Sequence, residues 1–112
     1  MKLWVDDERA APDDSWTVAV SSEDAISHLY MLGTPAVIAA NGGVKEVVQE
    51  VSLDHDLGGN DTGMRVLDWM TAWDEWPAVL TIHTANPPAR ENMLRAANAE
   101  APMSTSIYVI YR

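Results

Sequence analysis

Acidic and histidine side chains gather in three short polar segments, each of which directly follows an apolar run. The segments are Asp6-Asp7-Glu8 after residues 3–5, Asp54-His55-Asp56 after residues 51–53, and His83-Thr84-Ala85-Asn86 after residues 79–82. Short apolar runs of this kind are typical of buried strands. If the runs are parallel neighbours in one sheet, four aspartates and two histidines meet at the same edge of that sheet. Such a meeting indicates a site for a metal and a phosphate.

Carboxylates that converge in this way favour a divalent cation. Two carboxylates about 5 Å apart repel by roughly 3 kcal/mol at an effective dielectric constant near 20, so three or four at neutral pH need a cation or must take up protons. The candidate ligands are Asp6, Asp7, Asp54 and Asp56. Oxygen ligands select Mg²⁺, Mn²⁺ or Ca²⁺, and an adjoining imidazole favours Mn²⁺ or another transition ion. We therefore expect Mg²⁺ or Mn²⁺ as the cofactor.

The same segments supply candidates for proton transfer and for phosphate binding. A bound divalent ion lowers the pKa of water, and imidazole titrates in the range that acid–base catalysis needs. The catalytic candidates are His83, His55 and Asp54. The phosphate-binding candidates are Thr84, Asn86 and Arg90, which lie at or near a predicted helix start. The structural alternatives are that His55 caps its loop and that His83 is a hydrogen-bonded core residue.

Strands and helices alternate around these segments. Strands are predicted at residues 2–5, 17–20, 50–53, 78–82 and 106–111. Helices are predicted from Ser21-Ser22 to Gly33, from a Thr62 cap to about Asp74, and from Asn86-Pro87-Pro88 to about Ala99. In the second helix the side chains expected to face inward are Val66, Leu67, Met70 and Trp73. The stretch 36–48 fits either a hairpin turn at Asn41-Gly42-Gly43 or a break between helical pieces, and it is left unassigned.

Strands separated by helices predict an α/β fold with a mostly parallel, doubly wound, five-stranded sheet. In the flavodoxin-like order 2-1-3-4-5, the predicted strands at 2–5, 50–53 and 78–82 lie side by side. Ligands of such folds bind at the carboxyl ends of the strands, where the winding reverses. All three polar segments fall on those ends, which is the main argument for one shared site.

Composition limits the class of protein. The length of 112 residues and a hydrophobic content of 47% predict one folded domain spanning residues 1–112. Seventeen acidic against seven basic residues give a formal charge of −10, which argues against a groove for long nucleic acid and favours a small phosphorylated substrate or an RNA end. The chain has no cysteine for a disulfide or a thiolate metal site. It shows neither a signal peptide nor a membrane span, so a cytoplasmic protein is expected.

The order of these residues resembles a receiver domain, the phosphoacceptor module of two-component signalling. Receivers carry two acids after the first strand, a phosphorylatable aspartate after the third, a Thr or Ser after the fourth and a lysine after the fifth. Asp6-Asp7, Asp54 and Thr84 match the first three of these positions. The chain departs from the pattern because no lysine follows residues 78–82, histidines flank the acceptor position and precede Thr84, and Asp56 adds a carboxylate. The first and last receiver helices are also expected to be missing or vestigial.

These departures resemble an offshoot of the receivers, the receiver-like domains predicted to process cyclic phosphates in RNA repair and phage-conflict systems. The matching segments are residues 3–9 with Pro12, residues 52–58 and residues 82–87. The resemblance implies a metal-dependent phosphoesterase acting on a 2′,3′-cyclic RNA end or a small cyclic nucleotide. The alternatives are a signalling or binding receiver phosphorylated on Asp54, and a catalytically silent receiver-like adaptor.

Loss of the first and last receiver helices predicts a partly bare sheet face. About nine residues separate Asp7 from Thr17, too few for a usual crossover helix. The side chains expected on the bare face are Val5, Val18, Val20, Val109 and Tyr111. Exposed apolar surface of that extent usually marks an interface. Either residues 34–49 fold over this face or two copies pair through it, and we expect a homodimer.

Overall fold

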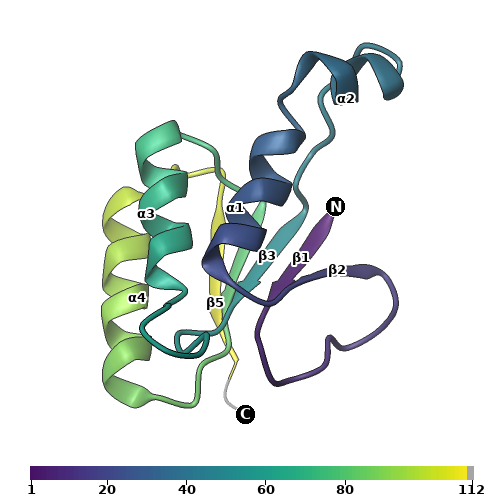
Figure 1. The fold of residues 1–112 in the computed structure, drawn as a ribbon. Helices are drawn as coiled ribbons and strands as arrows, with labels where there is room; N and C mark the ends of the chain where they lie inside the picture. Colours follow the sequence, from purple (N-terminus) through teal and green to yellow (C-terminus); the bar gives the residue numbers. More distant parts are fainter. Residues whose placement is uncertain (111–112) are drawn as a thin grey trace.

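The computed structural model describes residues 1–110, in which five parallel strands form one sheet (Figure 1). The strands are β1 (Lys2–Val5), β2 (Trp16–Ala19), β3 (Glu50–Leu53), β4 (Val79–Ile82) and β5 (Ser106–Val109). Their order is β2-β1-β3-β4-β5, and each neighbouring pair is parallel. The predicted flavodoxin-like order is therefore confirmed, and β1, β3 and β4 lie side by side at its centre.

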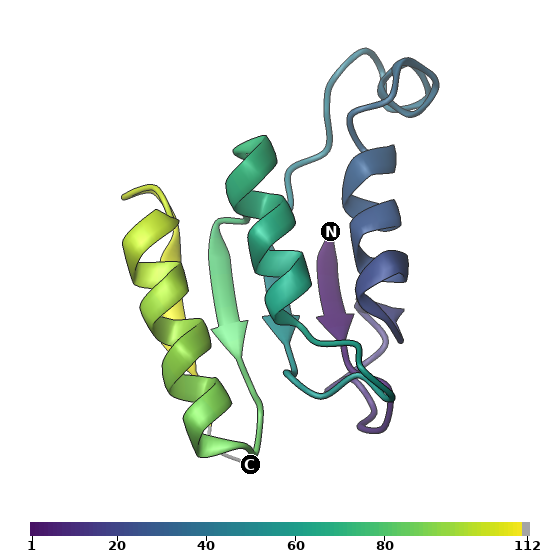
Figure 2. The ribbon, with the colours of Figure 1, turned by 60° about the vertical axis from the view of Figure 1, so that its left-hand side comes forward.

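Helices cover one face of this sheet (Figure 2). They are α1 (Ser22–Met31), α3 (Met64–Trp73) and α4 (Pro87–Glu100), and α3 packs between the other two. The core lies between these helices and the strands, with Leu3 and Val5 of β1, Leu53 of β3 and Ile82 of β4 fully buried. Residues 6–15, where the first receiver helix would stand, form no helix, so among residues 1–110 no helix takes its place on the other face of the sheet.

Two of the three predicted helix starts are confirmed. The Ser21 side chain accepts a hydrogen bond from the Asp24 N–H at 3.0 Å, and the Asn86 side chain accepts one from the Ala89 N–H at 3.2 Å. The predicted Thr62 cap of α3 is wrong, because the cap position is Gly63 and Thr62 instead forms an isolated bridge with Asp56. A side chain at Gly63 would collide with the backbone of Asp54, so close packing of the loop on β3 requires glycine there.

The tryptophan predicted to face inward from α3 does not do so. Trp73 is 59% exposed and stacks on Trp69, with ring centroids 6.0 Å apart. Trp73 is the last residue of α3. Val66, Leu67 and Met70 are buried as expected.

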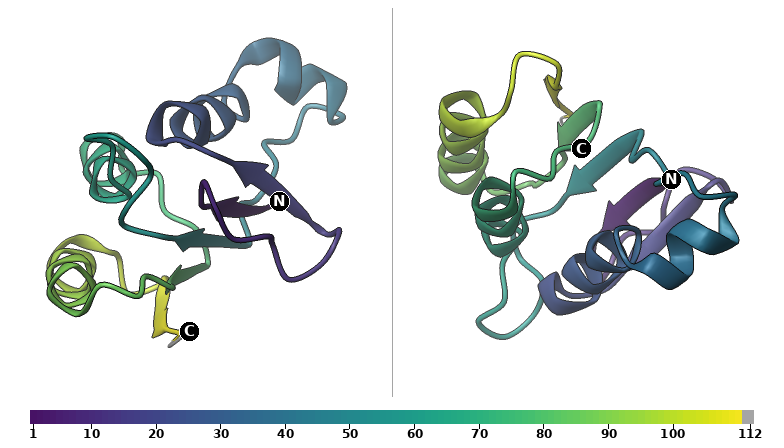
Figure 3. Two further views of the ribbon diagram at one scale, coloured as in Figure 1. Left: turned by 60° about the horizontal axis from the view of Figure 1, so that its bottom comes forward. Right: turned by 90° about the horizontal axis from the view of Figure 1, so that it is seen from above.

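The unassigned stretch contains a short helix, α2 (Pro35–Ala40), followed by a turn at Gly42 and Gly43 in which both residues have positive φ. No residue of α2 is buried. The helix projects away from the sheet (Figures 1 and 3), so residues 34–49 do not fold over the helix-free face.

The set of residues expected on the bare face is partly wrong. Val5 is buried in the core and Val109 packs against it, on the side of the helices. Because side chains alternate along a strand, the helix-free face instead carries the register row Trp4–Val18–Ser52–Thr81–Tyr108. In that row Val18 and Tyr108 are about half exposed, at 47% and 57%. Tyr111 lies outside the described residues, and the homodimer stays a prediction.

Candidate functional site

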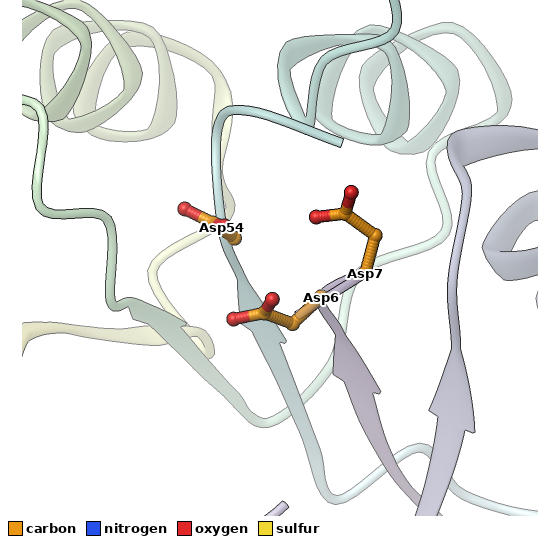
Figure 4. A group of neighbouring side chains, drawn as sticks. All are labelled: Asp6, Asp7 and Asp54. Atoms are coloured by element: carbon orange, nitrogen blue, oxygen red, sulfur yellow. The ribbon is translucent and has the colours of Figure 1, made fainter. Parts of the chain in front are cut away.

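Three carboxylates meet at the carboxyl edge of the sheet (Figure 4). Asp6 and Asp7 follow β1, Asp54 follows β3, and one oxygen from each lies within 4.8 Å of the others. The register pairs Val5 with Leu53, so the next residues, Asp6 and Asp54, leave the sheet at the same level. Asp6 is buried, Asp54 half-buried and Asp7 exposed. The predicted convergence of charge at this edge is therefore present in the geometry, and the cluster could bind a divalent cation.

The chain turns sharply after Asp6, and this turn lets consecutive aspartates share one side of the sheet edge. The Asp6 Oδ1 accepts hydrogen bonds from the backbone N–H groups of Glu8 at 2.8 Å and Arg9 at 2.9 Å. In an extended strand Asp6 and Asp7 would point to opposite faces. The Asp6 carboxylate itself folds the backbone out of that conformation, which brings Asp7 beside it.

His83 holds the second oxygen of Asp6. Its Nε2 lies 3.0 Å from Asp6 Oδ2, its Nδ1 lies 2.7 Å from Ser52 Oγ, and its ring stacks on Trp4 with centroids 4.0 Å apart. Burial lowers the pKa of His83, although Asp6 and Asp54 act to raise it. A neutral imidazole has one donor, and the carboxylate can only accept, so Nε2–H donates to Asp6 and Nδ1 accepts from the Ser52 hydroxyl.

This arrangement places His83 behind Asp6 rather than in contact with solvent. The residue is 0% exposed and does not line the cavity at the site. His83 is therefore a hydrogen-bonded core residue, which was the structural alternative considered from the sequence. Any effect of His83 on a ligand must therefore pass through Asp6.

The pKa of Asp54 is raised by its surroundings in the cluster. Burial raises the pKa of Asp54, and the charge of Asp6 raises it further, while hydrogen bonds from the His55 N–H and the Thr84 hydroxyl oppose the shift. The His55 N–H lies 2.8 Å from Asp54 Oδ1. A cation placed among the three carboxylates would relieve this repulsion.

The other predicted metal and catalytic residues form a separate pair. His55 Nδ1 lies 2.9 Å from Asp56 Oδ1, and the Asp56 side chain is 68% exposed. Asp56 lines the same cavity as the three clustered carboxylates but does not join their group, and His55 does not line it.

Of the three predicted phosphate-binding residues, the structure brings Thr84 to the cavity. The Asn86 side chain caps α4, and the backbone N–H of Asn86 donates to Thr84 Oγ1 at 3.2 Å. Arg90 Nη2 donates to the Thr84 carbonyl oxygen at 2.9 Å. Asn86 and Arg90 therefore hold Thr84 in place by hydrogen bonds and do not line the cavity themselves.

A cavity of about 570 Å³ opens over the cluster. It is lined by the turn after β1, the loop after β3 and the start of the segment after β4, with Asp6, Asp7, Glu8, Arg9, Asp54, Asp56, residues 58–62, Thr84 and Ala85. Sequence reasoning missed Arg9 and Asp61 as lining residues. The signal for Arg9 was its place three residues after Asp6, at the end of the turn that Asp6 stabilises.

The loop after β3 is fixed over the cavity by α1. Asp61 accepts hydrogen bonds from the Ser22 N–H at 2.8 Å and from the Ser22 hydroxyl, at the first turn of α1. Burial acts to raise the pKa of Asp61, but the hydrogen bonds from Ser22 outweigh it and hold the pKa below its ordinary value. The loop also needs Gly58, which has φ +85° and would place a side chain 3.1 Å from Asp7 Oδ2.

The comparison with protein families decides which receiver branch this site represents. The model of the cyclic-phosphate processing receiver domain matches residues 1–99. The chain belongs to this family. None of the curated proteins and none of the solved structures matches it.

In this cyclic-phosphate processing receiver domain, no lysine lines the cavity at the acidic cluster of Asp6, Asp7 and Asp54. The chain has two lysines: Lys45 pairs with Glu75 at 2.7 Å, and Lys2 lies over the Trp16 ring. Neither lines the cavity. Within residues 1–110, no helix has the length and apolar character needed to cross a membrane.

Proposed function

We propose that this chain is a divalent-metal-dependent phosphoesterase that opens a cyclic phosphate. The observation that carries the proposal is the meeting of Asp6, Asp7 and Asp54 within 4.8 Å, at the edge where parallel α/β sheets bind ligands. Among the described residues, no Lys or Arg side chain lies within 4.0 Å of these carboxylates to neutralise them. Membership in the cyclic-phosphate processing family supports a small phosphorylated substrate.

Asp6, Asp7 and Asp54 are the proposed ligands of Mg²⁺ or Mn²⁺, which both take carboxylate oxygens. Asp56 is a further candidate because it lines the same cavity. A divalent ion bound there would polarise a phosphoryl oxygen and lower the pKa of water. The Thr84 hydroxyl lines the cavity beside Asp54, and its one proton would turn from Asp54 to a non-bridging oxygen of the phosphate once a cation binds the Asp54 carboxylate.

Hydrolysis requires two proton transfers. The oxygen of water bonds to phosphorus, one ring P–O bond breaks, a base takes a proton from water and an acid gives one to the released oxygen. The proposed acid–base group is Asp56, which lines the cavity, together with His55, which does not line it and acts through its hydrogen bond to Asp56. His83 is proposed to act as a positioning residue that fixes Asp6.

The substrate is proposed to be a 2′,3′-cyclic RNA end or a small cyclic nucleotide. The net charge of −10 opposes binding of a long polyanion, whereas a short substrate needs contact with the cation and a few residues only. A role in RNA repair or in defence against phage is proposed only by analogy, because the receiver-like domains that the chain resembles are associated with such systems. A turnover assay with each substrate, in Mg²⁺ and in Mn²⁺, tests it.

Three variants make the assay specific. Asp54→Asn should abolish turnover, because a carboxylate ligand becomes a neutral amide. His83→Ala should lower turnover at limiting Mg²⁺, and excess Mg²⁺ should restore much of it, because His83 acts through the placement of Asp6. Asp68→Asn on the exposed surface of α3 is the matched control and should leave turnover unchanged. At limiting Mg²⁺, hydrolysis that persists undiminished in both Asp54→Asn and His83→Ala would reject the site.

A second candidate function is phosphorylation of Asp54, as in signalling receivers. Asp54 follows β3 and accepts a hydrogen bond from Thr84, which is the arrangement of a receiver acceptor and its hydroxyl partner. The absence of a nearby lysine argues against a stable acyl phosphate. Incubation with acetyl phosphate and Mg²⁺ followed by intact mass measurement separates the two functions, because a mass increase that Asp54→Asn removes would favour signalling.

A further inference from the structure

We propose that Arg9 is the cationic residue that binds the phosphate of the substrate, in the role that a lysine after the fifth strand fills in signalling receivers. The inference rests on the proposed function of the acidic cluster and names the group that gives it specificity for a phosphate. It concerns the side chain rather than the metal ligands, so it can be tested by phosphate binding as well as by turnover.

The position of Arg9 is fixed by hydrogen bonds from three sides. Its backbone N–H donates to Asp6 Oδ1 at 2.9 Å, and its carbonyl oxygen accepts from Trp4 Nε1 at 2.9 Å. Its Nη1 donates to the carbonyl oxygen of His83 at 3.0 Å. Arg9 is therefore held in one conformation before any ligand arrives, which lowers the entropic cost of binding.

The side chain crosses the carboxyl edge of the sheet. Arg9 lies in the loop after β1, whereas His83 follows β4, and β3 with Asp54 lies between these two strands. Arg9 therefore spans the strand that carries Asp54, and both residues line the same cavity. A phosphate contacting the clustered carboxylates through a cation would have its remaining oxygens near the guanidinium.

The charge of Arg9 sets it apart from the other charged residues that line the cavity. Within residues 1–110, Arg9 is the only basic side chain that lines the cavity, which it shares with six acidic residues: Asp6, Asp7, Glu8, Asp54, Asp56 and Asp61. Nevertheless, none of the ion pairs within 4.0 Å in the described part of the chain involves Arg9. Within the described residues, the Arg9 side chain donates one hydrogen bond, to the backbone carbonyl of His83, and this uses one of its five N–H donors. A guanidinium fork with unused donors matches the geometry of a phosphate.

A purely structural role for Arg9, as an anchor that ties the loop to β4, predicts a different outcome. Loss of an anchor would misplace Asp6 and Asp7 and so weaken both metal and phosphate binding. Loss of a phosphate ligand would weaken phosphate binding alone. Removal of a positive charge beside a cation site should even strengthen metal binding, because the cation is no longer repelled. The two roles therefore give opposite signs for metal affinity.

The experiment measures two affinities by calorimetry in the full chain. Mg²⁺ is titrated into the apo protein, and inorganic phosphate is then titrated into the Mg²⁺-loaded protein. Arg9→Gln should bind Mg²⁺ as tightly as the wild type or more tightly, and should bind phosphate about 10- to 100-fold more weakly, as expected for loss of a charge-assisted fork. Arg9→Lys, which keeps the charge but not the fork, should give an intermediate loss and serves if Arg9→Gln does not fold.

Arg95→Gln is the matched control, because it changes the net charge equally on the exposed surface of α4 and should leave both affinities unchanged. Equal phosphate affinity in wild type and Arg9→Gln would overturn the proposal, as would joint loss of Mg²⁺ and phosphate binding or a Mg²⁺-loaded wild type that binds no phosphate. A protein that hydrolyses no cyclic phosphate but loses phosphate binding in Arg9→Gln would refute the proposed enzyme and support the role of Arg9.

Discussion

Replacement of Asp54 by asparagine should stabilise the metal-free protein and destabilise the metal-loaded protein relative to the wild type. Asparagine keeps the size of the side chain and an oxygen that can accept the His55 N–H, which lies 2.8 Å from Asp54 Oδ1. It removes one of three negative charges whose oxygens lie within 4.8 Å of one another. The effect of charge is therefore isolated from the effect of packing.

The size of the effect follows from the geometry. At the 4.8 Å limit of the cluster, two unit charges repel by about 3.5 kcal/mol at an effective dielectric constant of 20 and about 0.9 kcal/mol in water. The buried Asp6 makes its pair with Asp54 closer to the first value, and the exposed Asp7 makes its pair closer to the second. The lost Thr84 hydrogen bond to the charged carboxylate offsets part of the gain. We expect a net gain of about 1–2 kcal/mol, or roughly 4 °C per kcal/mol in melting temperature.

Metal should reverse the order of stability. At a Mg²⁺ concentration one hundred times its dissociation constant, binding stabilises the wild type by about 2.7 kcal/mol, and the variant gains little. The assay is thermal unfolding followed by circular dichroism, in EDTA and in Mg²⁺, with Asp68→Asn as the control for net charge. If Asp54→Asn is less stable than the wild type in EDTA, or if both proteins gain equally from Mg²⁺, the electrostatic reasoning is refuted.

Three further substitutions test the support of the site. Gly63→Ala should cost about 2–3 kcal/mol or prevent folding, because a methyl group there collides with the backbone of Asp54, whereas Gly33→Ala, with no contact closer than 3.7 Å, should cost under about 1 kcal/mol in urea unfolding. Asp61→Asn should lower the free energy of unfolding by about 1–2 kcal/mol above about pH 5. Because the folded pKa of Asp61 is lowered from 3.8, this loss should vanish as the pH falls through the folded pKa. A loss that persists in acid would contradict the role given to the charged Asp61 carboxylate. His83→Phe should cost about 2–4 kcal/mol in urea unfolding and weaken Mg²⁺ binding in calorimetry, because the ring can still stack while its hydrogen bonds to Asp6 and Ser52 are lost; undiminished Mg²⁺ binding would remove its positioning role.

The central strands could be predicted because each is a short apolar run that ends in polar residues. The flavodoxin-like strand order makes β1 and β3 neighbours, so Asp6 and Asp54, which follow these strands, must lie close together. The capping residues Ser21 and Asn86 were predictable for a similar reason, since a cap acts within its own turn. The features that sequence predicts well are local or follow directly from strand order.

The features that sequence did not predict depend on contacts between distant segments. Gly63 begins α3 because of the Asp54 backbone, which no pattern around Gly63 reveals. From the sequence, His83 was a candidate for an accessible acid–base residue. Only its stacking on Trp4 and its hydrogen bonds to Ser52 and Asp6 show that it is enclosed. Val18 was correctly placed on the bare sheet face, but Val5 and Val109 were assigned to the wrong side of their strands, because alternation alone does not say which side the helices cover.

The most direct test of the central claim is the location of Mn²⁺ by anomalous X-ray scattering from crystals grown with the ion. The account predicts one strong anomalous peak per chain, about 2.0–2.3 Å from carboxylate oxygens of Asp6, Asp7 and Asp54. A peak at another place, or no peak here at Mn²⁺ concentrations that saturate the protein in solution, would contradict it.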